Sequence, residues 1–169
     1  IFKENQLTRN DVLARCSKDV MENSSKNICS MGIDVGKLLH VIIGYRISTS
    51  SYKVIKICSV HDFNEVHDLI KKFNVKRVVI DKRPETRKVR EFLAGEPGIM
   101  GYMADYKENM KGNAAWDIGN REVTVNRTEI CDTTHDLFTT DGKLELPRAT
   151  EEINNEFIPH ITAMVKVIS

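Results

Sequence analysis

The feature that most constrains this chain is a single aspartate inside a strand-forming run. Residues 30–37 read Ser-Met-Gly-Ile-Asp-Val-Gly-Lys, and an apolar run over residues 38–44 follows at once. This pattern predicts a strand that carries Asp34, a turn that Gly36 permits, and a second strand. A carboxylate is costly to bury in apolar surroundings unless it is paired or binds a cation. Asp34 is therefore either a functional acid or an aspartate that caps the turn.

Length and composition predict one globular domain. The chain has 169 residues, of which 41% are hydrophobic and 29% are charged. This is enough to build a core, and no apolar run is long enough to predict a membrane helix. The first residues are polar, unlike a signal peptide, so we expect an intracellular protein and, since no Met begins the chain, a segment of a longer one. The four cysteines include no C-x-x-C pair, which favours reduced thiols over a zinc site.

The first part of the chain predicts an arm followed by a meander of strands. Residues 1–27 are polar, with a weak helical pattern from Thr8 to Met21, and we expect them to form a linker or arm outside the main domain. The domain then spans residues 28–169. Strand-like runs at 28–35, 38–48 and 52–60 are joined by short polar connectors, which predicts three antiparallel strands.

The second part predicts helices alternating with strands. Asp62 and Glu65 have the spacing of a capping box, and the helix that they begin leads to a short buried strand at 76–81. Three β-branched residues in a row favour parallel pairing after a crossover helix. Further expected elements are a helix from Pro84, strands at 99–106 and 121–125, a loop at 107–120, and helices at 128–139 and 150–167. The fold class is therefore α/β, with a mixed sheet flanked by helices.

Two acids are predicted to meet at one edge of this sheet. Asp34 lies in the first strand and Asp81 ends the fourth. If these strands pair in parallel, their carboxylates emerge side by side and repel each other unless a cation binds. Mg²⁺ and Mn²⁺ prefer such oxygen ligands, and two such ions about 3.5–4 Å apart activate water and stabilise the leaving oxygen of a phosphodiester. Asp34 and Asp81 are therefore the candidate metal ligands and catalytic residues.

Basic residues cluster next to the second acid. The stretch from Lys71 to Arg90 holds nine Lys or Arg residues against two acids, although the net charge of the chain is only +1. Such clustering is typical of a nucleic-acid footprint, and the alternative is a solvated helix face. The residues expected to contact backbone phosphates of DNA are Lys82, Arg83, Arg87 and Lys88.

The residues around both acids resemble a known family. Residues 31–36 (Met-Gly-Ile-Asp-Val-Gly), 78–81 (Val-Val-Ile-Asp, with Pro84 and Glu85) and the segments at 125–129 and 141–147 look like the C-terminal nuclease domain of phage large terminase subunits. The resemblance implies a ribonuclease H-like, RuvC-resolvase-like fold. It also implies Mg²⁺- or Mn²⁺-dependent cleavage of concatemeric double-stranded viral DNA in the host cytoplasm. Its implied partners are an ATPase domain in the same polypeptide, the portal and the small terminase.

The chain departs from this family in two respects. It has no phosphate-binding loop, so the packaging ATPase is not within these residues. The family also has an acid near its C-terminal helix, which we expect to lie beyond residue 169. Three weaker candidates within the chain are Asp105, Asp132 and Asp136.

Three other classes of protein remain open from the sequence. A RuvC-like resolvase or transposase shares the metal chemistry but cuts another DNA structure. An actin-like ATPase or sugar kinase shares the Gly-Ile-Asp-Val-Gly turn but needs a second domain. A non-catalytic α/β assembly module would use Asp34 and Asp81 only to cap strands.

Overall fold

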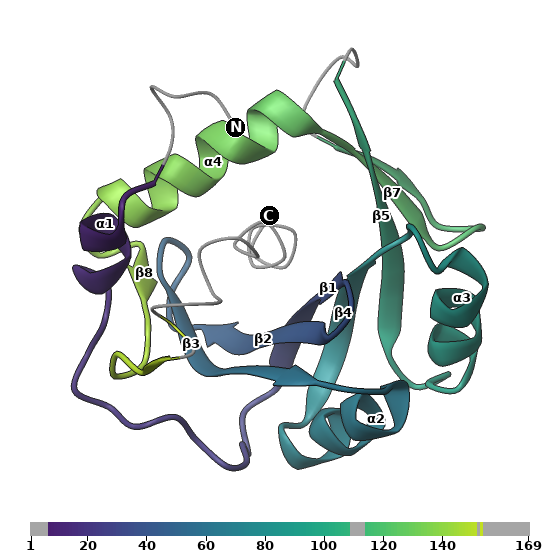
Figure 1. Cartoon of the computed structure of the whole chain (residues 1–169), viewed down its shortest axis with the longest axis horizontal. Coiled ribbons are helices and arrows are strands. Elements are labelled where there is room, and N and C mark those ends of the chain that lie inside the picture. Colours follow the sequence, from purple (N-terminus) through teal and green to yellow (C-terminus); the bar gives the residue numbers. More distant parts are fainter. Residues whose placement is uncertain (1–6, 109–113, 152, 154–169) are drawn as a thin grey trace.

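A central mixed β-sheet with helices on both faces forms the core of the molecule (Figure 1). The computed structural model describes residues 7–108, 114–151 and 153. Within them, the eight strands lie in the order β6-β7-β5-β4-β1-β2-β3-β8. The strands are β1 (Cys29–Val35), β2 (Leu39–Arg46), β3 (Tyr52–Val60), β4 (Val75–Asp81), β5 (Met100–Lys107), β6 (Ala114–Asp117), β7 (Glu122–Asn126) and β8 (Leu144–Glu145). The helices are α1 (Arg9–Leu13), α2 (Phe63–Lys72), α3 (Thr86–Ala94) and α4 (Arg127–Thr139).

The strand pairing confirms the predicted topology. Strands β1, β2 and β3 form an antiparallel meander, and β4 pairs in parallel with β1. Strands β5 and β7 extend the parallel part of the sheet, and β6 and β8 complete its two edges. The α/β class and the mixed sheet were thus predictable from the order of strand-like and helical patterns.

Local sequence signals explain where two helices begin. The Asp62 side chain accepts a hydrogen bond from the backbone N–H of Glu65, whose own side chain accepts from the N–H of Asp62. This is the capping box that the spacing predicted. Asn126 caps α4 in a similar way, because its Oδ1 accepts from the N–H of Glu129. Helix α3 begins after Glu85, so Pro84 precedes the helix instead of lying in its first turn.

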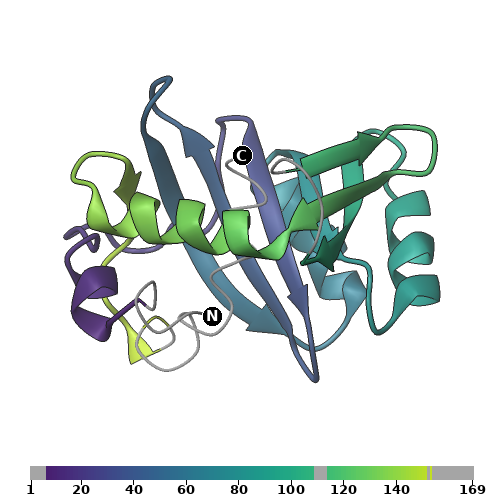
Figure 2. The ribbon, with the colours of Figure 1, turned by 90° about the horizontal axis from the view of Figure 1, so that it is seen from above.

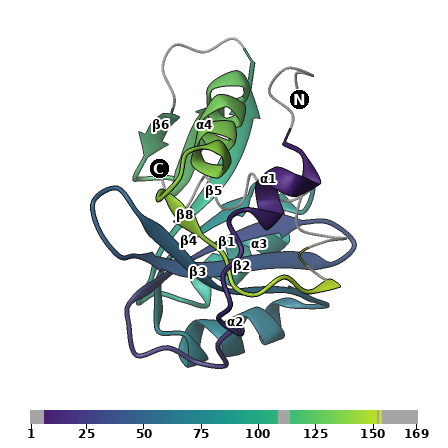
Figure 3. The same cartoon turned by 90° about the vertical axis from the view of Figure 1, so that its left-hand side faces the viewer.

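The sheet separates two apolar cores. On one face, α4 and α1 cover a core that includes Val12, Val79 and Phe138. On the other face, α2 and α3 cover a core that includes Ile80 and Phe73. Figures 2 and 3 show α4 crossing one face of the sheet and α2 and α3 lying against the opposite face. We call these the α4 face and the α2/α3 face.

Three expectations differ from the structure or lie outside it. The predicted loop at 107–120 contains strand β6, a short exposed edge strand whose Trp116 packs edge-on against Tyr102 with ring centroids 4.8 Å apart. Helix α1 ends at Leu13, well short of the expected Met21. The helix expected at 150–167 falls almost entirely outside the described residues.

The described part of the arm packs on the domain. Val12 is buried in the core of the α4 face. Backbone hydrogen bonds join Ser17 to Leu146, Glu22 to Ile55 and Ser25 to Lys72. Residues 7–27 therefore follow the surface of the sheet domain. No helix within the described ranges is both long and apolar enough to cross a membrane.

Candidate metal centre

The structure places the two predicted acids on neighbouring strands. In the parallel pair of β1 and β4, Ile33 lies opposite Ile80, and Asp34 and Asp81 are the next residue on each strand. Neighbouring strands lie about 4.8 Å apart. The two carboxylates therefore start from adjacent positions at the carboxyl ends of parallel strands.

Both acids lie on the α4 face. Met31 and Ile33 of β1 and Ile80 of β4 belong to the core of the α2/α3 face. Because successive side chains alternate between the faces of a sheet, Asp34 and Asp81 project from the opposite face. They therefore share one face and one end of the sheet, as two ligands of one cation must.

Hydrogen bonds fix the surroundings of these acids. The Oδ2 atom of Asp81 accepts a hydrogen bond of 3.1 Å from the backbone N–H of Val35, so this carboxylate reaches across to β1. His40 lies directly opposite Asp34 in the antiparallel β1–β2 pair, which puts both side chains on the same face. The Nδ1 atom of His40 is 2.9 Å from the Ser59 hydroxyl. These contacts come from the register between strands, which local sequence signals do not give.

Two carboxylates are suitable but incomplete ligands for a hard divalent ion. Mg²⁺ is usually held by one or two carboxylates with several waters and substrate phosphates. Within residues 7–108, 114–151 and 153, no group of three or more His, Cys, Asp or Glu side chains is arranged to hold a metal. The donor set thus fits a Mg²⁺ or Mn²⁺ site that takes its remaining ligands from elsewhere.

The weaker acidic candidates lie on other elements than this pair. Asp105 follows Ala104, the β5 partner of Asp81, but its Oδ1 is 3.5 Å from the Nε of Arg83. Alternation along β5 puts it on the α2/α3 face, because Ala104 belongs to the core of the α4 face. Asp136, in the last part of α4, pairs with Lys143, and this ammonium and the Thr140 hydroxyl hold the pKa of the carboxyl below its ordinary value. Asp132 lies in the middle of α4.

The four predicted DNA contacts follow β4 at the same end of the sheet, and each has an acidic partner. The closest pair joins the Nζ of Lys82 to the Oε1 of Glu122 at 2.8 Å. The Lys82 side chain is only 18% exposed, whereas that of Arg87 is 88% exposed. The other three pairs are Arg83–Asp105, Arg87–Glu91 and Lys88–Glu85, at 3.5, 3.6 and 3.8 Å. Arg83, Arg87 and Lys88 are therefore accessible, and Lys82 is mostly enclosed.

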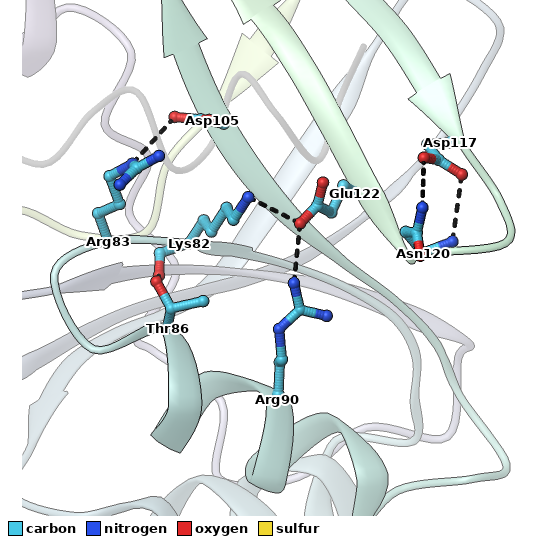
Figure 4. A network of polar contacts seen from close by, with 8 residues as sticks. All are labelled: Lys82, Arg83, Thr86, Arg90, Asp105, Asp117, Asn120 and Glu122. Carbon is cyan, nitrogen blue, oxygen red and sulfur yellow. Dashed lines mark hydrogen bonds and ion pairs between the residues drawn. The ribbon is translucent and has the colours of Figure 1, made fainter.

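Glu122 is a structural residue that the sequence analysis missed. Its Oε1 also accepts a hydrogen bond of 3.0 Å from the Nη2 of Arg90 (Figure 4). One carboxylate of β7 thus binds both the end of β4 and helix α3. No sequence signal marked it, since its partners lie 32 or more positions earlier in the chain. Thr86 adds a further contact, because its hydroxyl donates to the Lys82 carbonyl at 2.8 Å.

We compared the chain with known proteins. Searches against protein-family models, curated proteins and solved structures found no match for this chain.

Proposed function

We propose that this chain is the metal-dependent nuclease domain of a viral DNA-packaging enzyme, with a ribonuclease H-like fold. The observation that carries the proposal is the adjacency of Asp34 and Asp81 on one face, at the carboxyl ends of two parallel strands. A half-buried carboxylate is costly unless it is paired, hydrogen-bonded or bound to a cation, and here two such acids are neighbours.

The sheet order supports the fold part of the proposal. A meander of three antiparallel strands, followed by strands that add in parallel on the other side of β1, is the arrangement expected of a ribonuclease H-like domain. Helices α2 and α3 supply the crossovers between the parallel strands. Strand order alone leaves the chemistry open, because one fold hosts many functions.

The two carboxylates would hold the metal. A bound Mg²⁺ or Mn²⁺ ion, with a second ion where one binds, supplies an activated water and charge stabilisation for phosphodiester hydrolysis. Asp34 and Asp81 provide oxygen ligands, and the N–H of Val35 orients the Asp81 carboxylate. The exposed Arg83, Arg87 and Lys88 would exchange their weak acidic partners for DNA phosphates.

The substrate and partners follow from the family resemblance. The substrate proposed is concatemeric double-stranded DNA, cut at the start and end of genome packaging in the host cytoplasm. The proposed partners are an ATPase domain of the same polypeptide, the portal and the small terminase. Little sequence preference is expected, since the cations are placed to contact phosphates and phosphate contacts carry no sequence information.

Cleavage of plasmid DNA by the complete gene product tests the proposal. Asp34→Asn and Asp81→Asn should each lower Mn²⁺-dependent cleavage by more than about 100-fold, because even outer-shell partners of a metal are worth about 10- to 100-fold. Asp105→Asn is the matched control: it removes an acid from the next parallel strand but on the other face, and should keep most of the activity.

The same assay separates the alternatives. Full cleavage by a folded Asp34→Asn or Asp81→Asn variant would refute the site. Preferential cutting of four-way junctions would favour a resolvase, and turnover of ATP would favour the kinase-like class. Absence of cleavage and of Mn²⁺ binding in the wild-type gene product would favour the assembly module.

A further inference from the structure

A second polar site lies on the sheet, at the end opposite to the acids. It is a pocket of about 400 Å³ at the start of β1 and β4, lined in part by Ser30, Arg46, Tyr52 and Arg77. None of the described residues that line it is acidic. The pocket therefore has a positive lining, in contrast to the Asp34–Asp81 end.

One wall of the pocket is a buried phenol with an unsatisfied hydroxyl. Tyr52 is only 3% exposed, and its hydroxyl makes no hydrogen bond of good geometry among the described residues, although the Ser30 side chain is close enough to lower the pKa of the phenol against the larger effect of burial. Burial raises the pKa of this phenol, so it stays protonated and available as a donor near neutral pH. A buried hydroxyl without a partner is unusual in folded proteins and calls for an explanation.

A second wall is an arginine with a donor that is also unsatisfied. The Nε of Arg77 is buried and has no hydrogen-bond partner in the described part of the chain. The guanidinium lies over the ring of Trp116, 5.7 Å from its centroid, so an aromatic face supports it without accepting its N–H groups. Within those same ranges Arg77 makes no ion pair, unlike Lys82, Arg83, Arg87 and Lys88.

The fold makes room for this arrangement. Ser30 and Arg77 are partners in the β1–β4 register, and Tyr52 lies opposite Arg46 on the other side of β2. A Cβ on Gly44 would lie 2.6 Å from Cε1 of Tyr52 and 2.3 Å from the Lys53 carbonyl. Glycine at position 44 is thus what lets the Tyr52 ring pack against β2 at the wall of the pocket.

We propose that this pocket binds a phosphate group. The Tyr52 hydroxyl and the Nε–H group of Arg77 are both hydrogen-bond donors without a well-formed bond. A phosphate offers several acceptor oxygens with negative charge. The guanidinium of Arg77 provides the charge complement, with Arg46 at the exposed rim. The ligand is a phosphate of the DNA backbone or a free phosphate ion, which share this chemistry.

The pocket lies along the same strands as the proposed metal centre. Ser30 and Arg77 precede Asp34 and Asp81 by four residues on β1 and β4. At about 3.3 Å per residue this is roughly 13 Å, or about four base steps along one DNA strand. A duplex cut at the acids would thus place a backbone phosphate near the pocket, but phosphate binding itself does not depend on the proposed nuclease activity.

Titration of the isotopically labelled protein with inorganic phosphate tests the proposal, with chloride as the reference anion. The Nε–H resonance of Arg77 and the backbone amide resonances of Ser30 and Tyr52 should shift saturably with phosphate, and the amide resonances report binding in the variants as well. Arg77→Gln should weaken phosphate binding by at least about tenfold, and Tyr52→Phe by about two- to tenfold, as expected for a charged and a neutral hydrogen bond. The matched control is Arg121→Gln, since Arg121 also lies 5.7 Å from an aromatic centroid but does not line the pocket.

A short DNA duplex then distinguishes the two sources of phosphate. If the ligand is backbone phosphate, Arg77→Gln should also lower duplex affinity and reduce the salt slope by about one. If it is the free ion, the variant should lose phosphate binding alone. The proposal would be overturned if the wild-type protein showed no saturable shift with phosphate. If Arg77→Gln does not fold, Tyr52→Phe provides the test, and equal phosphate affinity of Tyr52→Phe and wild type would overturn the proposal. Asp34→Asn should bind phosphate normally, so a failed nuclease proposal leaves this one standing.

Discussion

The two faces of the sheet use charge in different ways. On the α2/α3 face, charged side chains neutralise each other: Glu122 binds Lys82 and Arg90, and Asp105 lies 3.5 Å from Arg83. On the α4 face, ion pairs such as Arg15–Asp141 join peripheral elements, but along β1 and β4 the acidic and basic side chains lie at opposite ends. Asp34 and Asp81 lie at the carboxyl end, and the Arg77 pocket lies at the other end.

Because of this difference, our proposals place ligand binding on the α4 face. Paired charges hold elements together and present little net field. Like charges held close together, such as the Asp34 and Asp81 carboxylates, cost free energy through their repulsion unless a cation or hydrogen-bond donors stabilise them. Under our two proposals, a ligand that brings a cation to the Asp34–Asp81 end and a phosphate to the Arg77 end would offset this cost.

The largest effect on stability is expected at Gly44, which shapes the α4 face. Gly44→Ala should lower the free energy of unfolding by about 1–3 kcal/mol, because the added Cβ meets backbone and a buried ring at less than 3.0 Å. Urea unfolding measures this loss. Gly98→Ala is the control, since a Cβ there meets nothing within 4 Å, and its stability should stay within about 0.5 kcal/mol of wild type. A stable, phosphate-binding Gly44→Ala protein would contradict the description of the pocket.

A smaller effect on stability should distinguish Lys82, which is mostly enclosed, from Arg87, which is exposed. Lys82→Gln should cost about 1–2 kcal/mol of stability, because it leaves the partly buried Glu122 with Arg90 alone. Arg87→Gln should cost less than about 0.5 kcal/mol, since its pair with Glu91 is exposed.

The loss of affinity for a DNA duplex should be larger for Arg87→Gln than for Lys82→Gln, the reverse of the order expected for stability. Arg87→Gln is expected to reduce the salt slope of DNA affinity by about one, whereas Lys82→Gln should change it less. The paired measurement is chemical unfolding and salt-dependent fluorescence anisotropy. A larger loss of stability for Arg87→Gln would show that the exposure of the two pairs does not decide their roles.

The smallest effect is a pH dependence at α1, on the α4 face. The hydrogen bond from the Thr8 backbone holds the pKa of Asp11 below its ordinary value of 3.8. A depressed pKa contributes stability above pH 3.8 that is lost as the pH falls through the folded-state value. Asp11→Asn should therefore unfold slightly more easily at pH 7, by about 0.5 kcal/mol, and match wild type near pH 2. A deficit that persists at pH 2 would assign the effect to packing.

Much of the sheet was predictable because its signals are local. The capping box at Asp62, the β-branched run before Asp81 and the strand limits at 52–60 all depend on residues within one element. The adjacency of Asp34 and Asp81 required only one further step, the rule that strands joined by a crossover helix pair in parallel. That step was correct.

The remaining features depend on register between distant segments. Glu122 gains its role from Lys82 and Arg90, and nothing around position 122 indicates this. The Tyr52–Arg77 pocket likewise needs the pairing of three strands before its two unsatisfied donors come together. Strand β6 was missed because Ala-Ala-Trp-Asp has neither alternation nor β-branched residues, so only its pairing with β7 defines it.

The backbone hydrogen bonds between the N-terminal arm and Leu146, just after β8, have a mechanical consequence. The N–H of Leu146 donates to the Arg15 carbonyl, and the Leu146 carbonyl accepts from the N–H of Ser17. These two hydrogen bonds attach residues 15–17 to the outer edge of the sheet. Tension applied through the arm would be borne first by this short edge ladder, three strands away from β1. The strand pair that carries Asp34 and Asp81 is thereby shielded from pulling forces applied to the chain ahead of residue 15.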